Sequence, residues 1–280
     1  MTAEAYTADL DIHDWIARLS PGQRVLDLGS GAGSFPATAF PCAIVTLDED
    51  PAVRASVCGC AGWLPFCNAS FDLVICHHSL EHIAAVDETL AEIARVLTPD
   101  GRCFVSIPNG YGLCDAVYRF VFEGGGHINR FRRQVIVNRI EQRAAVRLVR
   151  WQKLYSSFAY LRRLIDLLDA NPPGLAPRLV ALGRLPRWTI GFAQYVLYAG
   201  TRIVDAASGA DSSVYGWAFF FDRRTDGGPP REQPGYVNVC LFCGAGQAAR
   251  DAARPSRFRC QCAACGSLYP YIRPVRLKSK

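Results

Sequence analysis

A run of glycines directly after a short apolar stretch constrains the fold more than any other feature of this sequence. Residues 24–28 (RVLDL) predict a buried β-strand, and the loop GSGAGSF follows at once. Glycine permits tight turns and lets the backbone approach a ligand where a Cβ would collide. We therefore predict a strand that opens into a ligand-binding loop, with Asp27 before it and Gly29, Gly31 and Gly33 in it.

Strands alternate with helices along the first half of the chain. Apolar runs predict further strands at 43–50, 71–76, 102–109, 145–155 and 213–224, and helical periodicity predicts helices at 9–19, 81–97 and 127–145. Such alternation predicts a parallel sheet with helices on both faces. We expect a doubly wound, mostly parallel α/β fold with a helical insert and a small C-terminal module.

A carboxylate follows the glycine loop at the distance typical of nucleotide-binding folds. Asp48 closes the second predicted strand, where it can accept hydrogen bonds from the hydroxyls of a ribose. NAD is the competing ligand, but its G-x-G-x-x-G pattern is not kept because position 34 is serine. Asp27 also departs from the dinucleotide pattern, and an acid there suits an ammonium group.

Four stretches together resemble a known enzyme family. VLDLGSGAGSF, TLDED, WLPFCNASFDLVICHHSLEHI and LAEIARVLTPDGRCFVSIPN resemble, in order and spacing, the class I S-adenosylmethionine (SAM)-dependent methyltransferases, in the branch that includes the quinone-biosynthesis enzymes. The resemblance covers roughly residues 10–155 and implies SAM as cofactor.

The resemblance also implies residue roles. Asp27 and the three glycines would surround the methionine part of SAM, Asp48 would bind the ribose, and His77 would lie near the methionine end or the reacting centre. An acid usually contacts adenine at the position of Cys60. Here adenine would rely on backbone groups from Ala61 onward and on apolar stacking.

Two histidines are the candidates for catalysis. His78 and His82 follow the strand at 71–76 in the run CHHSLEHI, at the sheet edge where α/β folds bind ligands. A histidine near its ordinary pKa can accept a proton from a hydroxyl acceptor at neutral pH. A structural role for Glu81 and His82 at the start of a helix is the alternative.

Charge is distributed unevenly, and one basic block leads into an apolar insert. Residues 1–127 carry a net charge of −10, and residues 128–187 a net charge of +10. The insert at 157–208 combines leucines and aromatic residues with flanking arginines, which suits a small-molecule or lipid-linked acceptor or peripheral contact with a membrane. An ordinary helical subdomain, or a dimer contact, is the alternative.

The C-terminal segment carries paired cysteines. Cys240-x-x-Cys243-Gly and Cys262-x-x-Cys265-Gly have the spacing of a structural zinc site, whose four thiolates close the tetrahedral coordination. The repeated glycine selects these two pairs and leaves Cys260 spare. The module resembles a zinc ribbon, and its arginines make nucleic acid a further, less favoured partner.

These patterns give a division of the chain and three candidate functions. We expect a methyltransferase domain at 1–224, a linker at 225–236, a zinc ribbon at 237–272 and a basic tail at 273–280. The residues near Met1 have no secretory pattern, so a cytoplasmic protein is expected, with a peripheral membrane location as a variant. The favoured function is SAM-dependent methyl transfer to a small-molecule or lipid-linked acceptor. The alternatives are methylation of RNA or protein, and a binding module with a SAM fold that has lost catalysis.

Overall fold

The computed structural model divides the chain into two compact units. The first consists of Met1–Ile107, Phe131–Gln152 and Trp217–Pro234, and the second of Pro108–Arg130, Lys153–Gly216 and Gly235–Lys280. The structure describes residues 12–31, 33–35, 37–122, 126–155, 158, 161, 180–181, 184–223, 231–237, 253–256, 259–261 and 268–270.

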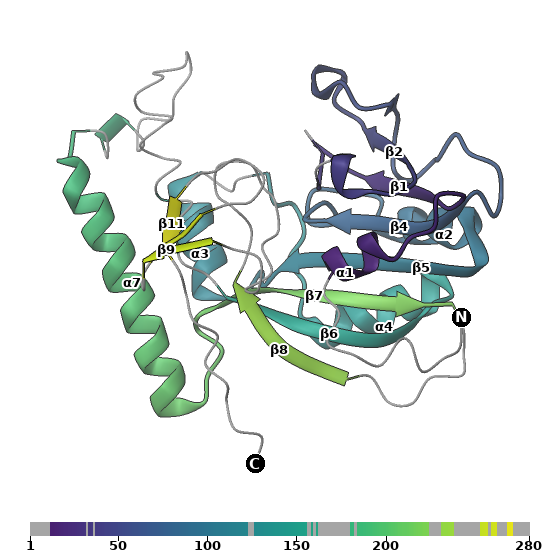
Figure 1. Ribbon diagram of the computed structural model, residues 1–280. Coiled ribbons are helices and arrows are strands. Elements are labelled where there is room, and N and C mark those ends of the chain that lie inside the picture. The colour runs from purple at the N-terminus through teal and green to yellow at the C-terminus, as the bar shows by residue number, and fades with distance from the viewer. Residues whose placement is uncertain are drawn as a thin grey trace. The chain divides into compact units, whose positions relative to one another are not determined.

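An eight-stranded sheet has the order β3-β2-β1-β4-β5-β7-β6-β8 (Figure 1). The strands are β1 Arg24–Leu28, β2 Ala43–Asp48, β3 Val57–Cys58, β4 Phe71–His77, β5 Leu97–Pro108, β6 Arg147–Tyr155, β7 Val214–Asp222 and β8 Arg231–Val237. The pairs β2–β3, β1–β2, β1–β4 and β4–β5 are parallel. The expected mostly parallel, doubly wound sheet is confirmed.

Strand β7 runs antiparallel to β5. The amide of Asn109, just past the end of β5, donates to the carbonyl of Tyr215, whereas the amide of Arg223 donates to the carbonyl of Gly101 at the other end. The end of one strand thus lies beside the beginning of the other. A strand that enters a sheet in the antiparallel direction does not need a crossover helix across the face of the sheet. The long connection between β6 and β7 is therefore not required to cover the sheet.

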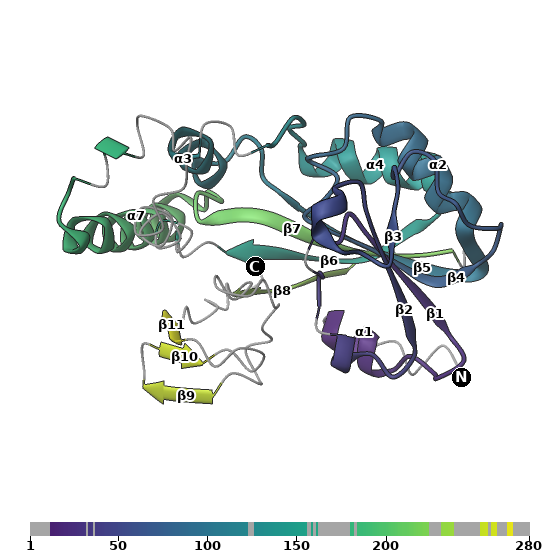
Figure 2. The same ribbon diagram turned by 90° about the horizontal axis from the view of Figure 1, so that it is seen from above.

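Helices cover both faces of the sheet in the first unit (Figure 2). The helices α2 Val86–Val96 and α4 Arg133–Ala144 lie on one face, and α1 Ile12–Ala17 on the other. Helix α2 turns a continuous apolar stripe inward, and Arg139 of α4 bonds to Asp87 of α2 at 2.6 Å. On the other face, Trp15 meets the ring of Phe220 edge-on at 4.9 Å.

Several predicted boundaries differ from the structure. The helix expected at 127–145 begins at Arg133, and the strand expected at 102–109 begins at Leu97. The helix expected from residue 81 begins at Val86, because residues 79–83 form tight turns in which the amides of His82 and Ile83 donate to the carbonyls of Ser79 and Leu80. Residues 231–236 of the expected linker belong to β8. Pro234 is compatible with this position because β8 is an edge strand, which has one side without partners.

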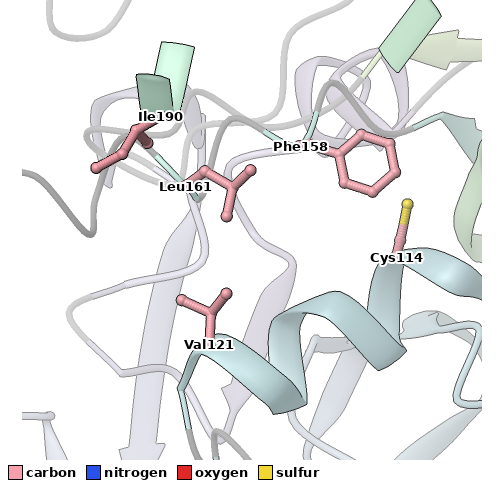
Figure 3. Packing of buried hydrophobic residues seen from close by; sticks show 5 residues of the cluster. All are labelled: Cys114, Val121, Phe158, Leu161 and Ile190. Atoms are coloured by element: carbon pink, nitrogen blue, oxygen red, sulfur yellow. The ribbon is translucent and has the colours of Figure 1, made fainter. Parts of the chain in front are cut away.

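The second unit contains helices α3 (Leu113–Val121) and α7 (Arg187–Ser208), which share an apolar cluster. Figure 3 shows Cys114 and Val121 of α3 turned toward Phe158 and Leu161, with Ile190 of α7 nearby. The insert is therefore helical over 187–208, and much of 157–183 lies outside the described residues. No helix in the described part of the chain is long and apolar enough to cross a membrane.

A second, three-stranded sheet also belongs to this unit. It has the order β11-β10-β9, with β9 Ala253–Ser256, β10 Arg259–Gln261 and β11 Leu268–Pro270. Both strand pairs are antiparallel. The sheet lies within the segment expected to form the zinc ribbon.

Candidate cofactor and active site

The glycine loop after β1 has a backbone conformation that other residues rarely adopt. Gly29, Gly31 and Gly33 have φ angles of 66°, 51° and 107°, all in the left-handed region. At Gly29 space is limiting as well, since a Cβ would lie 2.6 Å from the Cβ of Ser79. The loop therefore packs directly against the turn that follows β4.

Asp27 fixes the conformation of this loop. Its side chain is fully buried, and its two carboxylate oxygens accept the amide of Ser34 at 2.8 Å and the hydroxyl of Ser34 at 2.6 Å. Burial raises the pKa of Asp27, and the two hydrogen bonds from Ser34 oppose that shift. The structure shows Asp27 holding the loop closed, while its expected contact with the methionine part of SAM stays a prediction.

Asp48 joins the glycine loop to the segment expected to surround adenine. One carboxylate oxygen accepts the amide of Gly31 at 2.8 Å, and the other accepts the amide of Asp50 at 3.0 Å. The backbone carbonyl of Asp48 accepts the amide of Gly59, which leads directly to the exposed Cys60. A carboxylate oxygen can accept more than one hydrogen bond, so Asp48 keeps the capacity to bind ribose hydroxyls.

The predicted cofactor residues meet at one edge of the sheet. Parallel strands β1, β2 and β4 end side by side, with Leu28 paired to Leu47 and Asp27 to Ile75. The chain passes from β1 to β2 on one side and from β4 to β5 on the other, so this edge is the switch point where doubly wound sheets bind ligands. Ala61, the residue after Cys60, is buried.

His77 is held in place at the end of β4. Its Nδ1 lies 2.7 Å from the hydroxyl of Ser106 on the neighbouring strand β5. The imidazole is nearly parallel to the ring of Phe104 and lies 5.2 Å from that of Phe35. Phe35 follows the glycine loop, so His77 lies beside the loop, while its expected place near the methionine end of SAM or the reacting centre stays a prediction.

His78 and Glu81 form a pair with unusual surroundings. His78 has a φ of 52°, and its amide donates to the carbonyl of Ser106 at 3.0 Å. Its Nδ1 lies 3.3 Å from Oε1 of Glu81, a carboxylate that is 1% exposed. Among the described residues, Oε2 of Glu81 has no hydrogen-bond partner. A left-handed histidine beside a buried carboxylate is the kind of strained arrangement that occurs at functional sites.

His82 differs from His78 in its setting. It lies in the turn before α2 and is exposed, and its amide donates to the carbonyl of Ser79. The suggestion that Glu81 and His82 begin a helix is wrong, because α2 starts five residues after Glu81. The polar groups of this turn are therefore not used to cap that helix.

Two residues of the site were not predicted from the sequence. The hydroxyl of Ser34 donates to Asp27, and Ser106 contacts both His77 and His78. Ser106 had a usable signal, since it is the single polar residue in the buried stretch FVSIP near the end of a strand. Ser34 had none, because its partner is fixed only by the fold of the loop. Glu81 was expected at the start of a helix, and the structure places it against His78 instead.

The predicted metal ligands Cys240, Cys243, Cys262 and Cys265 all lie outside the described residues. The cysteines of the first unit are free thiols, of which Cys76 and Cys103 are buried in the sheet. Burial raises the pKa of the Cys103 thiol to about 12. These two thiols pack as core residues and do not belong to the site.

Comparison with known proteins agrees with this geometry. Residues 26–105 match the family model described as a methyltransferase domain. The match begins in β1 and ends in β5, and so contains the glycine loop, Asp48 and the histidine pair. Residues 26–105 are therefore similar to a methyltransferase domain, and the strand order of the sheet agrees with the class I methyltransferase fold.

Curated relatives match part of the chain. The biotin biosynthesis bifunctional protein BioHC of Cellvibrio japonicus is 28% identical over 60% of this chain and 38% of its own length. The ubiquinone/menaquinone biosynthesis C-methyltransferase UbiE of Ralstonia nicotianae is 32% identical over 32% of this chain and 44% of its own length. The chain thus spans about half or less of these relatives.

Solved structures with similar coordinates include the YcgJ protein of Bacillus subtilis. It is 18% identical, with a TM-score of 0.45, over 74% of this chain and 94% of its own. The phosphoethanolamine N-methyltransferase 2 of Haemonchus contortus is also 18% identical, with a TM-score of 0.44, over 74% of this chain and 50% of its own.

The packing of the glycine loop predicts a difference between two neighbouring glycines. Gly29→Ala meets both an unfavourable φ and the Cβ of Ser79, so it should lower the free energy of unfolding by about 2 kcal/mol or more. Gly31→Ala has the unfavourable φ but open space around the new Cβ, so about 1 kcal/mol is expected. Urea unfolding followed by circular dichroism measures both. Equal losses would show that the contact with Ser79 is unimportant.

Proposed function

We propose that this chain transfers a methyl group from SAM to a small-molecule or lipid-linked acceptor. The observation that carries the proposal is the arrangement around Asp48, whose carboxylate holds the glycine loop at Gly31 and whose carbonyl holds the segment before Cys60. One acid thus shapes both walls of a nucleoside site. The methyltransferase domain match over the same residues supports SAM as the nucleoside. The printed name of UbiE supports methyl transfer in the biosynthesis of a lipid-like small molecule, and that of BioHC supports a role in the biosynthesis of a small molecule.

Each group of predicted cofactor residues binds a different part of SAM. The left-handed glycine loop carries no side chain at Gly29, Gly31 and Gly33, so these positions let the methionine part of SAM approach the backbone closely. Asp48 binds the ribose hydroxyls. Cys60 and Ala61 border adenine through backbone groups, because neither side chain supplies the acid that the family usually has there.

His78 is the proton acceptor when the methyl group is transferred to a hydroxyl. Bound SAM would supply the methyl group to the acceptor oxygen, and the imidazole of His78 would take the proton that this oxygen loses. Glu81 orients that imidazole through Nδ1 and stabilises the imidazolium that results, which is how a buried carboxylate assists a histidine base. His82 is exposed and does not share the left-handed backbone of His78, so we assign it a minor role.

Cofactor binding is tested by two substitutions of equal charge change. Asp48→Asn should weaken SAM binding by about tenfold to a hundredfold, because the ribose loses a charge-assisted hydrogen bond while the amide oxygen still accepts from Gly31. The exposed neighbour Glu49 provides the control Glu49→Gln, for which less than about a twofold change is expected. Isothermal calorimetry with SAM measures both. Failure of the unmodified chain to bind SAM would contradict the proposal.

Catalysis is tested by separating the two histidines. His78→Ala should lower transfer of labelled methyl from SAM into a small-molecule and lipid extract by about a hundredfold or more, with SAM affinity retained. His82→Ala should retain most of the transfer. An equal loss in both variants, or a loss in His82→Ala alone, would contradict the assignment of the base to His78.

We also propose that the C-terminal segment binds zinc through Cys240, Cys243, Cys262 and Cys265. The described strands support this, because residues 262–267 connect the antiparallel pair β10 and β11, and a short connection of this kind can present two thiolates to one ion. With four thiolates the site is closed, so the metal stabilises the module.

Zinc content provides the corresponding prediction. The purified chain should contain one zinc ion, and Cys262→Ser should lose most of it because three remaining thiolates bind the ion less tightly. Cys260→Ser removes the spare cysteine two positions away and should keep the metal. Elemental analysis by mass spectrometry measures both. Equal zinc loss in the two variants would refute the choice of ligands.

A further inference from the structure

The second unit exposes far more apolar surface than the first. Among the described residues, fourteen large apolar side chains are exposed, and twelve of them belong to the second unit. Only Trp63 and Val135 belong to the first. Isolated apolar side chains on a surface are ordinary, but a contiguous group marks a surface that meets something else.

Helix α7 carries the densest part of this surface. One face packs on the unit's own cluster through Ile190, Leu197 and Tyr198, and Thr201 is buried on the same side. The burial also raises the pKa of Tyr198. Tyr198 is one of the aromatic residues of the insert, but it packs against the cluster and so is not part of the exposed surface.

The opposite face of α7 is apolar and uncovered. Its exposed side chains are Trp188 (71% exposed), Phe192 (62%), Tyr195, Val196 and Ile203. At about 100° per residue, these five positions fall within an arc of about 100° on the helix surface. We call these five residues the outer stripe. A stripe of this width, opposite a packed face, is typical of a helix that lies on an apolar surface.

The charges near the outer stripe favour an anionic partner. Helix α7 contains one acid, Asp205, whose carboxylate accepts the amides of Ser212 and Ser213 and so is held within the unit. Arg202 of α7 lies over the ring of Tyr155. Before the helix, Arg184 is exposed, and residues 156–187 contain five arginines against two aspartates. The stripe itself carries no charge.

We propose that the outer stripe of α7 lies in the interfacial region of an anionic lipid bilayer. Tryptophan and tyrosine are favoured at that depth because their rings are apolar and their N–H or O–H groups stay hydrated. The arginines that precede the helix supply attraction to anionic headgroups. Since the inner face is already packed, the helix lies flat on the bilayer. The proposal is independent of the chain's methyltransferase activity.

Vesicle binding by the full-length chain tests this proposal. Phe192→Glu puts a charge in the middle of the outer stripe, and it should lower the fraction bound to vesicles of phosphatidylcholine and phosphatidylglycerol by about tenfold or more. Ala193→Glu introduces the same charge at the next exposed position, off the stripe, and should change binding less than about twofold. Co-flotation measures the bound fraction. Sedimentation equilibrium and thermal unfolding are measured on the same samples.

The outcomes separate the proposal from its competitors. We expect binding to anionic vesicles, weaker binding to pure phosphatidylcholine, and unchanged unfolding temperatures in both variants. Absence of vesicle binding by the unmodified chain would overturn the proposal. A dimer that Phe192→Glu converts to a monomer, without vesicle binding, would instead assign the stripe to a second copy. Equal loss in both variants would show that general electrostatics, and not the stripe, governs binding.

Discussion

The candidate site depends on one buried interaction, the pair of hydrogen bonds from Ser34 to the carboxylate of Asp27. A fully buried carboxylate costs several kcal/mol unless its oxygens are satisfied, and Ser34 satisfies one oxygen with its amide and the other with its hydroxyl. This ties the far end of the glycine loop back to the strand from which it starts. The three left-handed glycines and the contact between Gly29 and Ser79 follow from that closure. Without the hydrogen bonds between Ser34 and Asp27, nothing on this side of the loop would offset the cost of its left-handed backbone.

The fold could be predicted from the sequence to a large extent, because strand and helix periodicity are local properties. The strands at 24–28 and 71–76 and the glycine loop were found within a residue or two. Less local features were missed. Helix α3 was not expected, and α2 begins later than its periodicity indicates because the turns at 79–83 take up the residues before it. The segment that contains β8 was predicted to be a linker because of its prolines, since composition does not distinguish an edge strand from a loop.

The site was predicted less completely than the fold. Residues at strand ends, such as Asp48 and His77, could be found because the carboxyl ends of parallel strands share one edge of the sheet. The contacts that hold them could not be predicted: Ser106 stands out as a polar residue in a buried stretch, but its contact with His77 depends on the pairing of β4 with β5. The left-handed φ of His78 was also beyond prediction, because no sequence pattern marks a histidine as strained. It distinguishes His78 from His82, which the sequence treated alike.

The division into two units has a consequence for how the chain can be cut. The chain passes between the units five times, and β5, β6 and β7 each continue from one unit into the other. In the sheet, β7 lies between β5 and β6, although it comes after both in sequence. A chain that ends before residue 214 would therefore leave two neighbouring strands with open edges, a state prone to aggregation. The two units are therefore inseparable as fragments, and an exchange of the segments of the second unit must replace them between the strands.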